Sequence, residues 1–129
     1  MNEGDAIRRL VEDRVRAMEE KDAAAAVAVL DPAVIAFEVA GPLQVTPDQA
    51  RDIAATQAWL DTFEDGPRVE LSEMKIYADG DVAFCHSINR LSGRMKDRRE
   101  VDLAMRSTLG FVKRDGEWTI VHAHTSVPR

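Results

Sequence analysis

The sequence predicts an α+β fold in which helices precede an antiparallel sheet. In the N-terminal half, apolar residues recur every three or four positions, the period of a helix buried on one face. After Pro67 the pattern changes to β-branched and aromatic stretches separated by glycine-containing turns, which is typical of an antiparallel meander. A chain of 129 residues suits one domain, so we expect residues 1–129 to form a single domain.

The first helix is predicted from an apolar stripe: Ile7, Leu10, Val11, Val15 and Met18. Asp22 is expected to cap a second, short helix over Ala23–Leu30. Asp31-Pro32 ends this helix because the residue before a proline is pushed out of helical space. The β-branched stretch Val34–Val39 is then predicted as a strand, which Gly41-Pro42 ends.

The sharpest local signal predicts a third helix. Thr46 can cap it, Pro47 fits the first helical position, and Gln49 completes a capping box. Its apolar positions continue to Phe63 before an acidic Gly-Pro sequence ends the element.

Four strands are predicted after this point: Val69–Tyr77, Val82–Leu91, Val101–Val112 and Trp118–Val127. Gly80 and Gly116 lie in the short turns of the first and last pairs, where a positive φ angle is favourable. The polar stretch Ser92–Arg98 is predicted as a longer hairpin loop.

Composition and charge exclude several classes of protein. Hydrophobic residues make up 45% and charged residues 31% of the chain, as in an ordinary globular domain. The net charge of -6 disfavours a nucleic-acid partner, because neutralising phosphates requires clustered Lys and Arg. The longest uncharged stretch, Val39–Pro47, is far too short to span a membrane. Cys85 is the single cysteine, and the charged N-terminus has no apolar signal core. Both observations lead us to expect a cytoplasmic protein.

Strand alternation gives a prediction for the last hairpin. If it turns on Asp115-Gly116, Leu109 lies opposite His122 and Arg106 lies opposite Thr125. A three-residue turn would instead place Arg106 opposite His124.

The two faces of the predicted sheet differ in character. One face is large and apolar and carries three histidines: His86, His122 and His124. The other is lined by small residues together with Arg106, Thr108 and Asn89. Because the predicted helices can cover only one side of the sheet, we expect a second copy of the chain against the outer side, forming a homodimer.

Two segments carry a family resemblance. The helix ending Ala17–Asp22 and the C-terminal run RDGEWTIVHAHTSVP, residues 114–128, resemble the SnoaL-like, ketosteroid-isomerase-like branch of the nuclear transport factor 2-like superfamily. The resemblance covers almost the whole chain. It implies a cone-shaped, cystatin-like fold in which three N-terminal helices pack on the concave face of a curved antiparallel sheet, with a pocket between them. Members include isomerases, cyclases, dehydratases and hub domains, so the fold does not settle the function.

Comparison with the steroid isomerases of this superfamily argues against a typical member. The position of their helical tyrosine is matched near Arg14, and that of their aspartate base by Ala36-Phe37, with Glu38 adjacent. Their protonated aspartate is matched at about Thr108. The steroid-isomerase mechanism needs a base and two hydrogen-bond donors. Of these three groups, this chain offers only a carboxylate, Glu38, and at a shifted position.

The chain is also similar to the association domain of calcium/calmodulin-dependent protein kinase II, whose ending resembles the two histidines here. In that domain, arginines on the strands equivalent to the last three predicted here line the pocket. The matching positions hold Asn89, Thr108 or Leu109, and Thr125, so Arg106 is the one cation available nearby.

Arg106 and Glu38 are the candidate catalytic residues. The Arg106 guanidinium would stabilise a carboxylate or an enolate oxygen, and Glu38 would act as the base. The alternative for Arg106 is an internal ion pair with Glu38 or Asp31. The candidate pocket residues are Arg14, Phe37, Trp59, Ser87, Asn89, Thr108 and Thr125.

The histidines form an alternative polar cluster. His86, His122 and His124 are expected to be structural or interface residues, with acid–base work as a second interpretation. A three-histidine zinc site would be a third. We expect no metal and no bound cofactor.

Two functional hypotheses remain open. The first is a small enzyme of isomerase, lyase or hydrolase type that acts on a small, partly apolar carbonyl or carboxylate compound. The second is a non-catalytic module that binds a ligand or dimerises.

Overall fold

The computed structural model describes residues 2–128, and its first two helices follow the predicted pattern. Helix α1 spans Glu3–Glu19 and buries Ile7 and Val11 on one face. The side chain of Asp22 accepts a hydrogen bond from the backbone N–H of Ala25, so it caps α2, which spans Ala23–Ala28. The predicted stripe of the first helix and the predicted cap of the second are therefore present, although α2 ends two residues before Leu30.

The predicted third helix is divided into two. The capping box of Thr46 and Gln49 opens α3, Pro47–Ala50, as expected. A second cap follows at once, because the Asp52 side chain accepts from the Ala55 N–H and opens α4, Ile53–Leu60. An apolar periodicity that runs through two short helices cannot by itself reveal the break between them.

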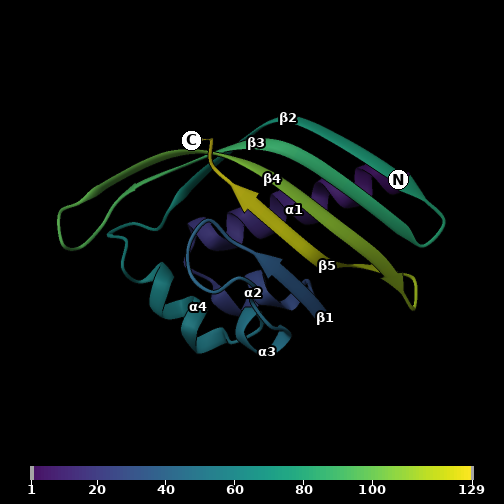
Figure 1. Ribbon diagram of the computed structural model, residues 1–129, viewed down its shortest axis with the longest axis horizontal. Helices are drawn as coiled ribbons and strands as arrows, with labels where there is room; N and C mark the ends of the chain where they lie inside the picture. The colour runs from purple at the N-terminus through teal and green to yellow at the C-terminus, as the bar shows by residue number, and fades with distance from the viewer. Residues whose placement is uncertain (1, 129) are drawn as a thin grey trace.

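Five strands form one arched sheet (Figure 1): β1 Leu30–Phe37, β2 Arg68–Asp79, β3 Val82–Arg94, β4 Glu100–Arg114 and β5 Glu117–Ser126. Their order is β1-β5-β4-β3-β2. Strands β2 to β5 are antiparallel as predicted, whereas β1 pairs with β5 in parallel, so the sheet is mixed. Strand β1 begins at Leu30, ahead of the predicted Val34, and includes Asp31-Pro32. The α+β class is confirmed.

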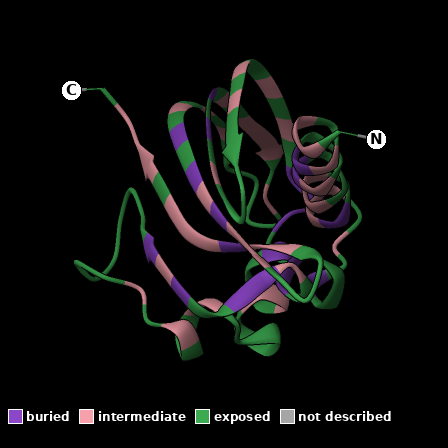
Figure 2. Ribbon diagram, turned by 90° about the vertical axis from the view of Figure 1, so that its right-hand side faces the viewer, coloured by how far each residue is buried: buried purple, intermediate pink, exposed green. Residues whose placement is uncertain are grey.

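The helices lie on the concave side of the sheet, which we call the inner face (Figure 1). Ile7 and Val11 of α1 belong to one buried cluster with Cys85, Leu109 and Phe111 of the central strands. Figure 2 shows the buried stretches on α1, β1 and the strands beside them. Burial of these apolar side chains is the main stabilising contribution to the fold.

A β-bulge in β5 changes which residues share a face. The last hairpin turns on Asp115-Gly116 as predicted, and Phe111 pairs with Ile120. Next along the strands, Gly110 pairs with His122, so Val121 is left over. The extra residue reverses the alternation beyond this point.

The predicted pairing of Leu109 with His122 and of Arg106 with Thr125 is therefore wrong. Leu109 pairs with Ala123 and Arg106 with Ser126. The buried Ile120 lies on the inner face, whereas His122 and the following histidine lie on the opposite side, which we call the outer face.

Both ends of α1 are attached to the sheet. Glu3 forms an ion pair of 2.8 Å with Lys113 near the end of β4. At the other end, a Glu19 carboxylate oxygen accepts from the Val69 N–H at 3.1 Å. Gly66 allows this approach, since a Cβ there would lie 2.3 Å from the Glu19 carbonyl oxygen. The middle of α1 is thereby held across the inner face of the sheet.

None of the helices within residues 2–128 is long and apolar enough to cross a membrane.

Candidate functional site

A row of hydroxyl side chains crosses the inner face of the sheet. Ser87 of β3 pairs with Ser107 of β4, which pairs with Thr125 of β5. Ser87 and Ser107 are 8% and 9% exposed, so this row is polar but largely removed from water. Asn89 lies two residues further along the same face and accepts a 2.7 Å hydrogen bond from the Ser87 hydroxyl. We call these four residues the inner polar row.

Arg14 is the cation on the same side of the sheet. It follows Ile7 and Val11 on the buried stripe of α1, between the two ends of the helix that are attached to the sheet. Its Nε atom is buried and has no hydrogen-bond partner. Burial lowers the pKa of Arg14, and the negative charge of Glu38 acts in the opposite direction.

The Arg14 side chain is thus partly buried, with its Nε atom enclosed and without a matched counter-charge. Within residues 2–128, its side chain takes part in none of the ion pairs, and Glu38 is an exposed residue beyond the end of β1. Buried polar groups in native proteins are nearly always hydrogen-bonded, so an unpaired guanidinium nitrogen requires an explanation.

The predicted pocket residues are divided between the two faces. Ser87, Asn89 and Thr125 lie together in the inner polar row. Arg106 and Thr108 lie on the outer face, where both are exposed. The prediction that all of them share one face is wrong because β3 and β4 pair Asn89 with Met105 rather than with the row containing Arg106.

The predicted partner of Arg106 is also different. Its Nε donates a 3.2 Å hydrogen bond to the Ser126 hydroxyl on the neighbouring strand. No ion pair within residues 2–128 joins Arg106 to Glu38 or to Asp31, so both predicted pairings are wrong. Glu38 acts electrostatically on Arg14 instead.

Asp31 is paired with another arginine. Its carboxylate is 1% exposed and accepts hydrogen bonds from Arg114 Nε at 2.6 Å, Thr119 Oγ1 at 2.8 Å and the Ala33 N–H at 2.9 Å. These bonds, above all the one from Arg114, lower the pKa of Asp31 from 3.8 to about 2. This arrangement joins β1, β4 and β5 and is structural.

Two predicted aromatic pocket residues lie elsewhere. Phe37 is on the outer face, with its ring edge-on to His122 at 4.9 Å and to His124 at 5.4 Å between centroids. Trp59 of α4 is 43% exposed and packs edge-to-face on the buried Phe63. Phe37 is therefore separated from the inner polar row by the thickness of the sheet.

The three histidines share the outer face, as the strand pattern suggested, together with Phe84 and Ile88 of β3, whereas the predicted apolar row of β4 with Leu109 and Phe111 lies on the inner face. Thr108 pairs with both His86 and His124, and the Nδ1–H of His122 donates to the Ile35 carbonyl at 2.9 Å. Among residues 2–128, no three His, Cys, Asp or Glu side chains gather as they would around a metal ion.

Cys85 lies on the inner face beside the core. Burial raises the pKa of its thiol to about 11, so it stays protonated and unreactive near neutral pH.

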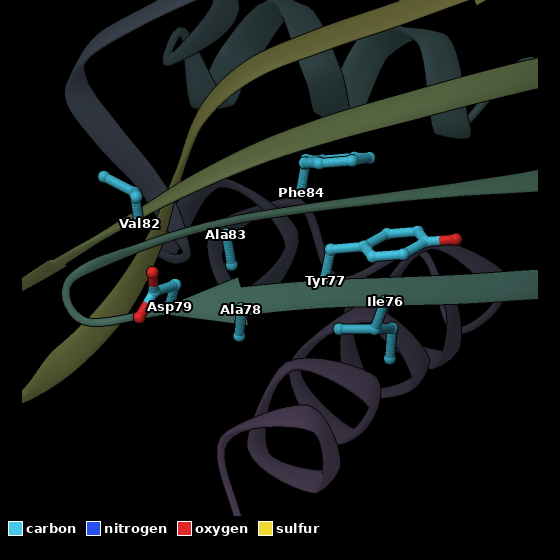
Figure 3. A pocket seen from close by; sticks show the side chains of 7 residues that line it. All are labelled: Ile76, Tyr77, Ala78, Asp79, Val82, Ala83 and Phe84. Atoms are coloured by element: carbon cyan, nitrogen blue, oxygen red, sulfur yellow. The ribbon is translucent and has the colours of Figure 1, made fainter.

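A hollow of about 520 Å³ lies at the tip of the β2–β3 hairpin (Figure 3). Its lining includes Tyr77 and Phe84, whose rings stack at 4.9 Å between centroids. Figure 3 shows these two rings on one side of the hairpin, while Ile76 points toward α1. The lining also includes Ile76 and Ala83, whose strand positions face inward, so both faces of the hairpin tip contribute to the hollow, and Arg14 is not among its lining residues.

Sequence reasoning missed Ser107 and the importance of Arg14. Ser107 interrupts an otherwise apolar row of β4, and that interruption was its signal. Arg14 stands in the apolar stripe of α1 at the position after Val11 where another buried side chain is due. A charged residue in such a stripe was the available sequence signal for a cation on the inner side of the sheet.

Comparisons with known proteins agree on the family. The SnoaL-like domain family matches residues 7–129. No curated protein matches the chain in sequence. An NTF2-like protein of unknown function from Pseudomonas putida KT2440 superposes with a TM-score of 0.82 at 25% identity, over 99% of this chain and 89% of that one.

Two further solved structures show the same fold. A proposed calcium/calmodulin-dependent protein kinase II association domain from Xanthomonas campestris has a TM-score of 0.82 at 18% identity, over 99% of this chain and 89% of that one. A proposed dehydratase of the NTF2-like family from Streptomyces avermitilis has a TM-score of 0.79 at 15% identity, over 97% and 95%.

Proposed function

Because this chain belongs to the SnoaL-like domain family, we propose that it binds a small molecule between α1 and the inner face of the sheet. The observation that carries the proposal is the buried, unpartnered Nε of Arg14. A guanidinium held this way is costly to the empty protein, and a ligand that accepts its hydrogen bonds removes that cost.

The inner polar row supplies the other half of the proposed site. A purely structural interior would fill this part of the sheet with apolar side chains, as Cys85 and Leu109 do one step away. Hydroxyls at Ser87, Ser107 and Thr125 can instead orient a bound molecule by donating or accepting hydrogen bonds. The apolar residues of α1 beside them suit a ligand that is partly apolar.

Catalysis is the second candidate function. Glu38 is the carboxylate whose charge acts on Arg14, so a base and an oxygen-stabilising cation are brought into the same region. This favours an isomerase, lyase or hydrolase type of reaction on a carbonyl or carboxylate compound, and one neighbour in fold is described as a proposed dehydratase. In the non-catalytic alternative the same residues hold a ligand without transforming it. Substitution Glu38→Gln separates the two, since it would abolish turnover and leave ligand binding intact.

We also propose a homodimer through the outer face. Apolar side chains are exposed there on neighbouring strands, among them Tyr77 at 52%, Phe84 at 46% and Ile88 at 43%. Exposed large apolar side chains gathered on one face of a sheet are typical of a protein interface. Sedimentation velocity at micromolar concentration is expected to give twice the monomer mass of 14.3 kDa.

A pair of adjacent β4 residues tests the binding proposal. Small carboxylates and cyclic ketones are screened for a rise in the melting temperature of the wild type. For any compound found, Ser107→Ala on the inner face is expected to reduce the rise, and Thr108→Ala on the outer face is expected to leave it unchanged. The opposite pattern, or no stabilising compound in either class, would contradict the proposal.

A further inference from the structure

The strongest unexplained charge in the molecule is the guanidinium of Arg14. Several other arginines pair with carboxylates, as Arg90 does with Asp102 and Arg114 with Asp31. Arg14 pairs with none of the described residues, although its side chain is partly buried and its Nε atom is enclosed. The protein thus keeps a buried Nε–H group without a hydrogen bond, which costs free energy of folding.

We infer that the proposed binding site selects an anion, namely a small monocarboxylate whose oxygens are held by Arg14. This inference rests on the binding proposed above. The planar guanidinium presents its N–H groups as a fork that matches a carboxylate, and one of them, on Nε, is free of any protein acceptor. Hydroxyls of the inner polar row would complete the hydrogen bonds of the bound oxygens.

The charges around the site suit one negative charge on the ligand. Glu38 is the carboxylate that acts on Arg14, and it is exposed and outside ion-pair distance. A bound monoanion would neutralise Arg14 in the interior, whereas a dianion would leave an excess charge facing Glu38. A neutral ligand would leave the guanidinium uncompensated.

The apolar surroundings restrict the rest of the ligand. Val11 of α1, together with Cys85 and Leu109 of the sheet, borders the region on one side. A ligand body that is cyclic or branched and largely apolar therefore fits better than a polyhydroxylated one.

Matched ligand pairs test the inference. Benzoate and benzamide, and cyclohexanecarboxylate and its amide, are titrated by calorimetry into the wild-type protein, Arg14→Gln and Arg14→Lys. We expect each carboxylate to bind the wild type at least about tenfold more tightly than its amide. We expect Arg14→Gln to remove this preference and Arg14→Lys to retain part of it, because lysine keeps the charge but lacks the fork.

Arg9→Gln is the matched control, since Arg9 is an exposed arginine on the same helix. It is expected to leave both affinities unchanged. Arg14→Gln is also expected to melt at or above the wild-type temperature, because it removes no protein contact of Nε, so a loss of binding is not a loss of folding.

The outcomes separate this inference from the proposed function. If the amides bind as tightly as the carboxylates and Ser107→Ala weakens both, the binding site stands and its anion selectivity is wrong. A carboxylate preference that survives in Arg14→Gln would also overturn the inference. If no member of either pair binds, the proposed function falls together with it.

Discussion

Replacing Asp31 by asparagine is expected to lower the free energy of unfolding by about 3 kcal/mol. The Asp31 carboxylate uses both oxygens: Oδ1 accepts from Arg114 and Thr119, and Oδ2 accepts from Ala33 and Arg114. In an asparagine, an NH2 group would replace one of these two oxygens, and the donors that face it would lose their acceptor. Urea denaturation at neutral pH measures the loss.

A surface pair with the same geometry provides the control. Asp102 accepts two hydrogen bonds from Arg90, at 2.7 and 2.6 Å, but both side chains are more than half exposed. We expect Asp102→Asn to cost far less than Asp31→Asn, because solvent screens an exposed pair. Equal losses from Asp31→Asn and Asp102→Asn would show that burial of Asp31 does not strengthen its interactions.

Lowering the pH is expected to destabilise the fold through Asp31 as well. The folded-state pKa of Asp31 is about 2, below the usual 3.8, so its charged form stabilises the fold above about pH 4. The difference corresponds to about 2 kcal/mol, which is lost as the pH falls from about 4 to about 2. Asp31→Asn is expected to lack this part of the acid dependence. A wild-type stability that is flat over this range would contradict the assignment.

Replacing Phe84 by glutamate is expected to weaken the proposed homodimer by at least about 100-fold. Phe84 lies in the exposed apolar part of the outer face, stacked on Tyr77 across the β2–β3 pair. A carboxylate there would have to lose its water when two sheets meet. Sedimentation velocity over a concentration series measures the change.

Leu43→Glu is the matched control for this prediction. Leu43 is 99% exposed, but it lies in the segment between β1 and α3 rather than on the outer face. The same substitution there is expected to leave the dimer intact. A wild-type monomer, or equal dimerisation of Phe84→Glu and the wild type, would remove the outer face as the interface.

Local signals in the sequence predicted much of the fold. Helix caps act over three residues, and Asp22 and Thr46 both make the hydrogen bonds that their side chains allow. The tight turns at Gly80 and Asp115-Gly116 also depend only on local backbone preferences, and both glycines have positive φ. The parallel pairing of β1 with β5 was not predicted because it joins segments far apart in the chain.

The candidate site was harder to predict because one residue decides which way a strand faces. Val121 is the extra residue of the bulge, and it separates the buried Ile120 from His122, which simple alternation places on one face. Gly110, which pairs at the bulge, was the available signal, since a glycine inside a strand often marks one. The error at Arg106 has a separate cause: Asn89 pairs with Met105 in β4, so Arg106 lies on the outer face, whereas the structure places Arg14 on the inner side.

The most direct test of the account is a crystal structure of the protein with benzoate bound. The account predicts the carboxylate oxygens within hydrogen-bond distance of the Arg14 guanidinium, on the α1 side of the sheet and beside the hydroxyls of Ser87 and Ser107. Benzoate bound instead at Arg106, or only in the hollow lined by Tyr77 and Phe84, would contradict it.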